Sequence, residues 1–317
     1  MGTDVISLGG WKVDNQAIEL ANTVSSQFQQ GSGDGVLGLA FSNTNTGRTL
    51  VENLIAKEDI PKSAELFTAK LGRWKAGKQS DKEPFYTFGF VDQETVDATG
   101  EEIYYTPIDK SQGFWLFDSP SASVNGKTIT RSGNKAIADT GTPLALVDDE
   151  LCKDIYDTIP GSHYDEDSHG YIYPANTTED NLPVVSLAVG EKQFIVQKKD
   201  LGLTEAKSGY IYGGIQSRGT MTMDVLGLTF LTGIYAVSHI LYFMWHSSNA
   251  GRSLMLVLCN SGQFRRRTCG KACLFRNEQS LLYTWVTVIV KTQSHSRMVH
   301  NNTFGQLCIY IGQGTSI

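Results

Sequence analysis

Cysteines, long apolar runs and excess basic charge are scarce in most of this sequence. Four of the five cysteines lie within residues 238–317, which leaves Cys152 alone in the rest of the chain, so no disulfide framework is expected. The longest apolar run, residues 281–290, is about half of what a membrane-spanning helix requires. The net charge of −6 argues against nucleic acid or an anionic membrane as a partner.

The composition changes near Val237. Residues 238–317 contain eight of the 27 basic residues, one of the 33 acidic residues and no proline. We therefore expect this segment to be unrelated to the preceding sequence, poorly ordered, and derived from translated non-coding or out-of-frame sequence. Cys269 and Cys273 lack a second ligand pair at zinc-site spacing, so no metal is expected there.

The residues before Val237 show the patterns of a mainly β protein with short helices. Alternating apolar residues around the turn at 190–191 predict one hairpin, and Asn125-Gly126 predicts another. Helices are expected over residues 49–57 and 148–159, the second with Leu151, Ile155 and Ile159 on its buried face. The two hairpins lie within residues 183–201 and 123–128, and further strands are expected at 5–8, 34–41, 67–71, 85–91, 103–107, 113–117 and 210–215.

One polar turn is enclosed by apolar residues on both sides. Residues 136–138 lead into Asp139-Thr140-Gly141-Thr142, and residues 144–147 lead out of it. Gly141 supplies the conformational freedom that the turn needs, and the flanking strands would hold the Asp139 carboxylate rigidly. An Asp-Thr-Gly tripeptide alone is more often an ordinary turn, but this setting makes Asp139 a candidate acid or base.

An apolar pattern occurs twice, 190 residues apart. Residues 34–41 and 224–231 share an acidic residue followed by two aliphatic residues, glycine, leucine, a small residue and phenylalanine, with small differences in spacing. The repeat predicts two related lobes, each with a buried strand beside its own active turn.

These motifs give the chain a resemblance to the pepsin-like aspartic endopeptidases, particularly the secreted fungal ones. Asp139-Thr140-Gly141-Thr142 matches the catalytic loop of the second lobe in that family. Val36-Leu37-Gly38 and Val225-Leu226-Gly227 match the two apolar-apolar-Gly segments that cross the catalytic loops. The resemblance extends from about Thr3 to Val237.

The resemblance implies a bilobal, mainly β fold with an incomplete first lobe. Residues 1–99 would be the remainder of the N-terminal lobe, residues 100–237 a nearly complete C-terminal lobe, and residues 238–317 a tail outside the family pattern. The Asp-Thr-Gly tripeptide occurs once in the sequence, so the catalytic loop and flap of the first lobe are expected upstream of residue 1. Leu228 also departs from the family, which usually has Asp at that position.

The resemblance also implies roles for the residues of the turn. Asp139 would be one of two carboxylates that share a proton and activate water for attack on a peptide bond. Thr142 would hydrogen-bond the outer carboxylate oxygen, and Thr140 would brace the turn against its counterpart in the other lobe. The backbone of Gly141 and Thr142 would bind an extended polypeptide substrate, with no cofactor and no metal.

The resulting expectation is a monomeric aspartic endopeptidase that acts at acidic pH and of which this chain alone is inactive. The family implies a secreted or vacuolar location, although the residues after Met1 carry no signal-peptide pattern. Two alternatives are a non-catalytic peptide-binding fragment and a homodimeric protease that takes Asp139 from each of two chains. The homodimer is disfavoured because the surplus first-lobe strands would crowd a two-fold interface.

Overall fold

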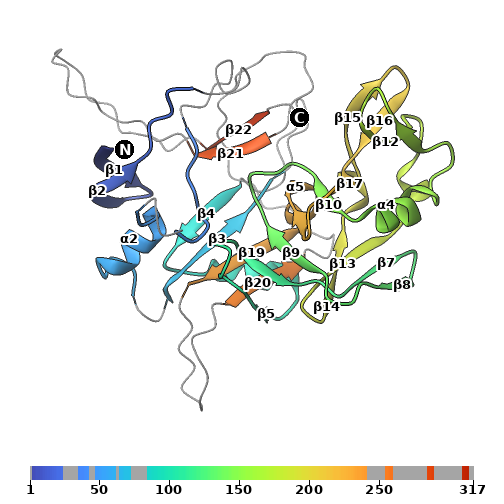
Figure 1. Ribbon diagram of the computed structural model, residues 1–317. Helices are drawn as coiled ribbons and strands as arrows, with labels where there is room; N and C mark the ends of the chain where they lie inside the picture. The colour runs from blue at the N-terminus through green and yellow to red at the C-terminus, as the bar shows by residue number, and fades with distance from the viewer. Residues whose placement is uncertain are drawn as a thin grey trace.

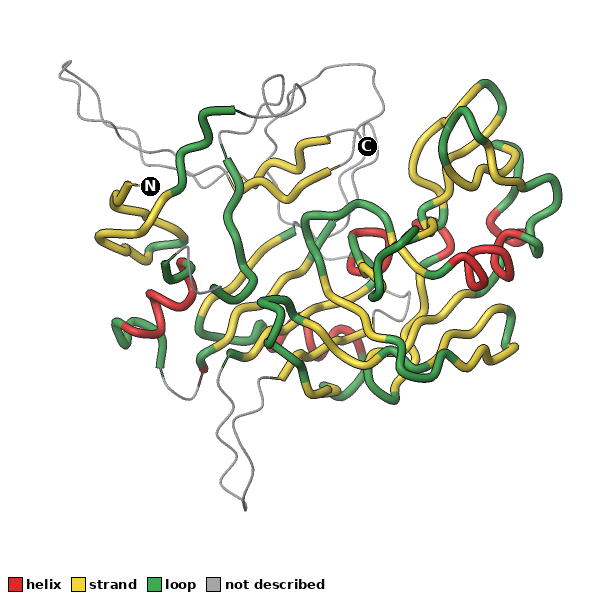
Figure 2. The backbone as a smooth tube through the Cα atoms, in the orientation of Figure 1, coloured by secondary structure: helices red, strands yellow, loops and turns green. Residues whose placement is uncertain are grey.

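The computed structural model describes residues 2–23, 35–42, 47–61, 64–72 and 84–240, together with strands at 254–259, 284–288 and 309–313. This described part is mainly β, as predicted (Figures 1 and 2). The helices are α2 (Leu50–Ala56), α3 (Gln93–Thr99), α4 (Asp149–Tyr156) and α5 (Leu228–Leu231). The strands are β1 (Gly2–Leu8), β2 (Trp11–Ile18), β3 (Leu66–Lys70), β4 (Phe85–Phe88), β5 (Tyr104–Pro107), β6 (Leu116–Asp118), β7 (Ser121–Val124), β8 (Lys127–Thr130), β9 (Lys135–Ala138), β10 (Ala145–Val147), β11 (His163–Asp165), β12 (Gly170–Pro174), β13 (Val185–Val189), β14 (Lys192–Val196), β15 (Gly202–Lys207), β16 (Tyr210–Gly213), β17 (Ile215–Ser217), β18 (Asp224–Leu226), β19 (Ile234–His239), β20 (Leu254–Cys259), β21 (Thr284–Val288) and β22 (Ile309–Gln313).

A five-stranded sheet in the order β17-β10-β18-β9-β6 carries the Asp139 turn. β18 pairs parallel with β9 and antiparallel with β10, so it lies between the two strands that flank the turn. A strand inserted between two strands joined by a tight turn must cross the mouth of that turn. The chain after β18 therefore passes directly beside Asp139.

A second five-stranded sheet joins segments that are far apart in the sequence. Its order is β4-β3-β19-β20-β5. In Figure 1 it lies between the β1-β2 hairpin with α2 on one side and the strands β12, β15 and β16 with α4 on the other. The sheet contains strands from all three segments expected from the sequence, 1–99, 100–237 and 238–317. The division of the chain into these three segments remains a prediction.

The predicted hairpins are confirmed. β13 pairs with β14 so that Val185 faces Val196 and Leu187 faces Phe194, and all four side chains are buried. β7 and β8 are joined by Asn125-Gly126, and both of these residues adopt positive φ angles, of 50° and 82°. This conformation is the one that a two-residue hairpin turn of the Asn-Gly type requires.

Both predicted helices are also confirmed. The Thr49 side chain accepts a hydrogen bond from the Glu52 amide, and the Glu52 side chain bonds back to Thr49, which forms a capping box at the start of α2. Asp148 caps α4 by accepting from the amide of Leu151. The three apolar residues predicted to form the buried face of this segment are each at most 3% exposed (Leu151, Ile155 and Ile159).

The strand predicted over residues 34–41 is wrong for the described part of that segment. Residues 35–42 form no strand, and the Val36 residue is 56% exposed. The segment is held instead by the Phe41 amide bonded to the carbonyl of Gly113 and by Trp115 Nε1 bonded to the carbonyl of Leu39. Apolar residues make a buried strand only where neighbouring strands pair with them, and β18 has such neighbours on both edges whereas residues 35–42 do not.

One hydrophobic cluster runs through most of the described chain. It extends from Ile6 in β1 to Ala236 in β19 and includes Phe117, Leu151 and Phe230. The Asp139 turn is therefore supported by strands whose apolar side chains, such as Ala136 and Val147, are fully buried. In the described residues no helix is both long enough and apolar enough to cross a membrane.

Candidate active site

The Asp139 carboxylate is held by the turn that carries it. Its amide donates to the carbonyl of Leu226 in β18, with an N–O distance of 3.1 Å. Oδ1 accepts a hydrogen bond from the amide of Gly141 at 2.8 Å, and Oδ2 accepts from Thr142 Oγ1 at 2.6 Å. Residues 139–142 are all only partly buried. The carboxylate is thus fixed in orientation on a turn that is not fully buried.

Gly227 allows the crossing segment to approach the turn. Its amide donates to the carbonyl of Leu144 at 3.1 Å, and the next amide, of Leu228, donates to the carbonyl of Thr142 at 2.7 Å. A Cβ on residue 227 would lie 2.1 Å from the Thr142 carbonyl oxygen and 2.3 Å from that of Leu144. Only glycine leaves room for this contact, which explains the glycine that ends the apolar-apolar-Gly motif.

The Leu228 departure from the family pattern leaves the backbone contact intact. The Thr142 carbonyl is bonded by the Leu228 amide, which any residue except proline can supply. The Leu228 side chain is partly buried and packs against the main hydrophobic cluster. Leucine at this position therefore preserves the geometry of the turn.

Tyr86 in β4 lies close to the turn, and our reading of the sequence missed it. Burial raises its pKa to about 12; the Thr140 hydroxyl lowers the value and the Asp139 charge raises it. Tyr86 Oη is buried and makes no geometrically complete hydrogen bond among the described residues. Tyr86 lies within the strand expected over residues 85–91, and no local motif marked it.

The described residues place one carboxylate at this site. Asp139 bonds to Gly141 and Thr142, and no acidic side chain of the described part is hydrogen-bonded to it. In the same part of the chain, no group of three or more His, Cys, Asp or Glu side chains is placed to hold a metal ion. A partly buried carboxylate with two fixed donors can bind a water molecule and exchange a proton with it.

The fold and the turn together define the class of protein. The structure shows the strand order, the crossing segment and the hydrogen-bonded Asp-Thr-Gly-Thr turn. Residues 1–240 also match the model of the eukaryotic aspartyl protease family. The chain belongs to this family.

Fungal relatives also place the chain in the aspartyl protease family. The chain is 33% identical over 240 residues to aspergillopepsin-1 of Aspergillus oryzae and 32% identical over 241 residues to penicillopepsin-3 of Penicillium janthinellum. Each match covers 74% of this chain and 57% of the relative, so the chain spans little more than half of their length.

A solved structure shares the fold. The aspartic proteinase from Irpex lacteus matches with a TM-score of 0.60 and 20% sequence identity. The match covers 82% of this chain and 76% of that protein. At this identity the likeness concerns the fold alone.

Proposed function

We propose that Asp139 is one of two catalytic carboxylates in an endopeptidase that hydrolyses polypeptides at acidic pH. The observation that carries the proposal is the pair of hydrogen bonds that fixes both oxygens of Asp139, from the Gly141 amide and the Thr142 hydroxyl. A carboxylate fixed in this way needs no reorganisation before it accepts a proton from an attacking water.

The chemistry needs a second acid beside Asp139. Two carboxyl groups about 3 Å apart cannot both ionise, so they share one proton. The ionised group removes a proton from water as the water attacks the scissile carbonyl, and the other group polarises that carbonyl and protonates the leaving amine. Thr140 would brace the turn against the loop that carries the second acid, and the backbone of Gly141 and Thr142 would bind the extended substrate.

The single Asp-Thr-Gly of the sequence leads to a second part of the proposal. In a bilobal arrangement, residues 1–99 belong to an incomplete first lobe and residues 100–237 to a nearly complete second lobe. The chain alone then lacks its partner acid and is inactive. The complete enzyme acts as a monomer, without a cofactor, in a secreted or vacuolar compartment.

Peptide hydrolysis at acidic pH, with and without pepstatin, tests the proposal. The assay compares the chain alone with the chain joined to a segment that supplies a second Asp-Thr-Gly loop and flap. We expect pepstatin-sensitive hydrolysis only in the completed form, and loss of at least about a thousandfold in kcat with Asp139→Asn, since one half of the catalytic pair is removed. Asp165→Asn, which changes a carboxylate on another sheet, is the matched control and should retain activity.

The remaining outcomes separate the alternatives. A folded, completed form without activity would contradict the proposal and favour a non-catalytic peptide-binding protein. Hydrolysis by the chain alone that disappears with Asp139→Asn, in a particle of twice the chain mass, would instead indicate the homodimeric arrangement.

A further inference from the structure

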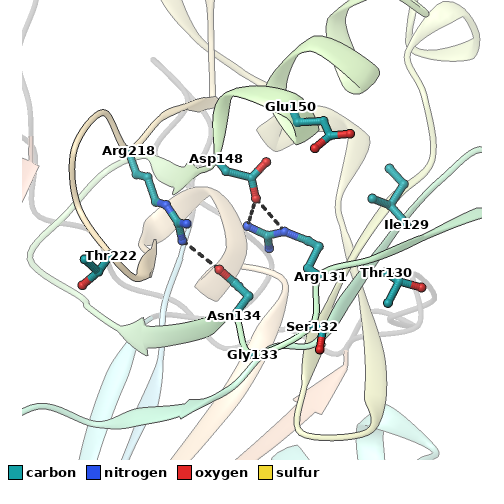
Figure 3. A pocket seen from close by; sticks show the side chains of 10 residues that line it. All are labelled: Ile129, Thr130, Arg131, Ser132, Gly133, Asn134, Asp148, Glu150, Arg218 and Thr222. Carbon is teal, nitrogen blue, oxygen red and sulfur yellow. Dashed lines mark hydrogen bonds and ion pairs between the residues drawn. The ribbon is translucent and has the colours of Figure 1, made fainter.

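A cluster of charged and amide side chains lies at the ends of strands β17, β10, β18 and β9 that are opposite the Asp139 turn. Its members are Arg131, Asn134, Asp148, Arg218 and Asp224. Four of them line a pocket with a volume of about 370 Å³ (Figure 3), namely Arg131, Asn134, Asp148 and Arg218. Thr130, Ser132, Glu150 and Thr222 are among the other residues that line it. Asp224 begins the second copy of the apolar repeat and Asp148 begins the helix predicted over 148–159, but no motif in the sequence linked these residues to one another.

Asp224 is the centre of the cluster and is completely buried. Its Oδ1 accepts hydrogen bonds from Arg131 Nη2 at 2.8 Å and Arg218 Nη1 at 2.7 Å. Its Oδ2 accepts from Arg131 Nη1 at 2.5 Å and Asn134 Nδ2 at 3.0 Å. Two donors on each oxygen fill the acceptor capacity of a carboxylate, so this buried charge is fully satisfied.

The other members complete a charge-balanced set. Asp148 binds Arg131 through Oδ2, with the Nε–Oδ2 distance at 2.8 Å, while its Oδ1 caps α4. Asn134 Oδ1 accepts from Arg218 Nη1 at 2.8 Å. Two guanidinium groups thus face the two carboxylates of Asp148 and Asp224.

Each of four adjacent strands contributes one residue to the cluster, and all four residues lie at the same end of the strands. Asp224 is the first residue of β18, and Asp148 directly follows β10. Arg218 directly follows β17, and Asn134 directly precedes β9. A shift of any one of these strands along its neighbours would separate a buried ion from its partner, which is costly in a low-dielectric interior.

The same strands define the position of Asp139 at their other end. Asp224 pairs with Ala136, and two residues further along β18 the carbonyl of Leu226 accepts the amide of Asp139. The register set by the cluster is therefore transmitted along two short paired strands to the turn.

We propose that Asp224 is a positioning residue for Asp139, because it fixes the register of β17, β10, β18 and β9 at the strand ends that lie opposite the turn. Its functional meaning rests on the catalytic role proposed for Asp139. The structural claim can be tested without any activity.

Amide hydrogen exchange in the full chain, followed by NMR, tests the proposal. Asp224→Asn removes the charge but keeps the side-chain size. We expect the amides of Asp139 and Gly141 to exchange about tenfold faster or more, since the turn opens locally, while the amide of Leu187 in β13 changes by less than about threefold. Asp165→Asn, which removes an ion pair with Lys207 on a different sheet, should leave the turn amides unchanged.

A second variant keeps the test decisive if Asp224→Asn does not fold. Asp224→Asn combined with Arg218→Gln restores the charge balance, so we expect it to fold and to show turn exchange between that of the parent and that expected for the single variant. The proposal is overturned if the amides of Asp139 and Gly141 exchange in the Asp224 variants at the same rate as in the parent. It is also overturned if exchange of the Leu187 amide accelerates by the same factor, or if Asp165→Asn accelerates exchange at the turn as much as Asp224→Asn does.

Activity gives a separate readout in the completed enzyme. There Asp224→Asn should lower kcat about tenfold or more with little change in KM, because the turn is displaced but the substrate contacts elsewhere remain. If the completed enzyme hydrolyses no peptide even without the Asp224 substitution, the proposed function fails. The hydrogen-exchange result still decides the positioning role of Asp224.

Discussion

Gly227→Ala tests the contact between the crossing segment and the Asp139 turn. The added Cβ would lie 2.1 Å and 2.3 Å from the carbonyl oxygens of Thr142 and Leu144, closer than real Cβ contacts. Both neighbours are backbone atoms, so no side-chain rotation can relieve the overlap. The crossing segment must therefore move away from the turn.

The cost follows from what such a movement breaks. The hydrogen bonds from the amides of Gly227 and Leu228 to the turn would be lost or weakened. At about 1 kcal/mol for each bond and about 1–3 kcal/mol for overpacking, the free energy of unfolding should fall by roughly 3–5 kcal/mol. For a domain of this size, a loss of that magnitude corresponds to a decrease in Tm of about 10 °C.

Gly38→Ala is the matched control, since Gly38 ends the other copy of the same apolar-apolar-Gly motif. A Cβ there meets no atom within 4 Å among the described residues, so the variant should stay within about 1 kcal/mol of the parent. Urea unfolding of the two variants, followed by fluorescence and circular dichroism, gives the comparison. Equal effects of the two substitutions, or a Gly227→Ala loss below about 1 kcal/mol, would refute the packing assigned to Gly227.

Three further substitutions test the surroundings of the turn and the acid stability of the fold. Thr142→Val removes the donor to Asp139 Oδ2 and should lower the free energy of unfolding by about 1–2 kcal/mol in urea unfolding, whereas Thr142→Ser should stay near the parent; equal losses would contradict a role for the hydroxyl. Tyr86→Phe removes a buried hydroxyl that lacks a complete hydrogen bond, so the variant should be as stable as the parent or up to about 1 kcal/mol more stable, and a clear loss would show that the hydroxyl is satisfied. Lys207 and Ser168 hold the pKa of Asp165 at about 2, below its unfolded value of about 3.9, so the stabilisation is complete above pH 4 and is lost as the pH falls through 2. Lys207→Met should therefore be less stable than the parent above pH 4, and the two urea-unfolding curves should converge near pH 2; a gap that does not change with pH would contradict this assignment.

Local patterns in the sequence were sufficient where the structure is determined locally. The β13-β14 hairpin and α4 follow from apolar spacing, an Asp cap and turn residues, all within a few positions of one another. The hydrogen bond between Thr142 and Asp139 is likewise a contact three residues apart, and it was expected from the family resemblance.

Features set by distant partners could not be predicted in the same way. Residues 34–41 and 224–231 have similar sequences, but only the second copy contains a buried strand, β18, because β18 has a paired strand on each edge and the described residues 35–42 have none. The repeat also concealed α5, where the chain turns into a helix after Gly227. The Arg131–Asp224 pair joins residues 93 positions apart, and no spacing in the sequence links them.

The central claim is that catalysis needs two acids and that this chain supplies one of them, Asp139. Peptide hydrolysis at acidic pH by the purified chain, with the particle mass measured by light scattering in the same sample, tests this claim most directly. The account predicts no pepstatin-sensitive hydrolysis by a particle that contains one chain. Hydrolysis by such a monomer, abolished by Asp139→Asn and unaffected by Asp165→Asn, would contradict it.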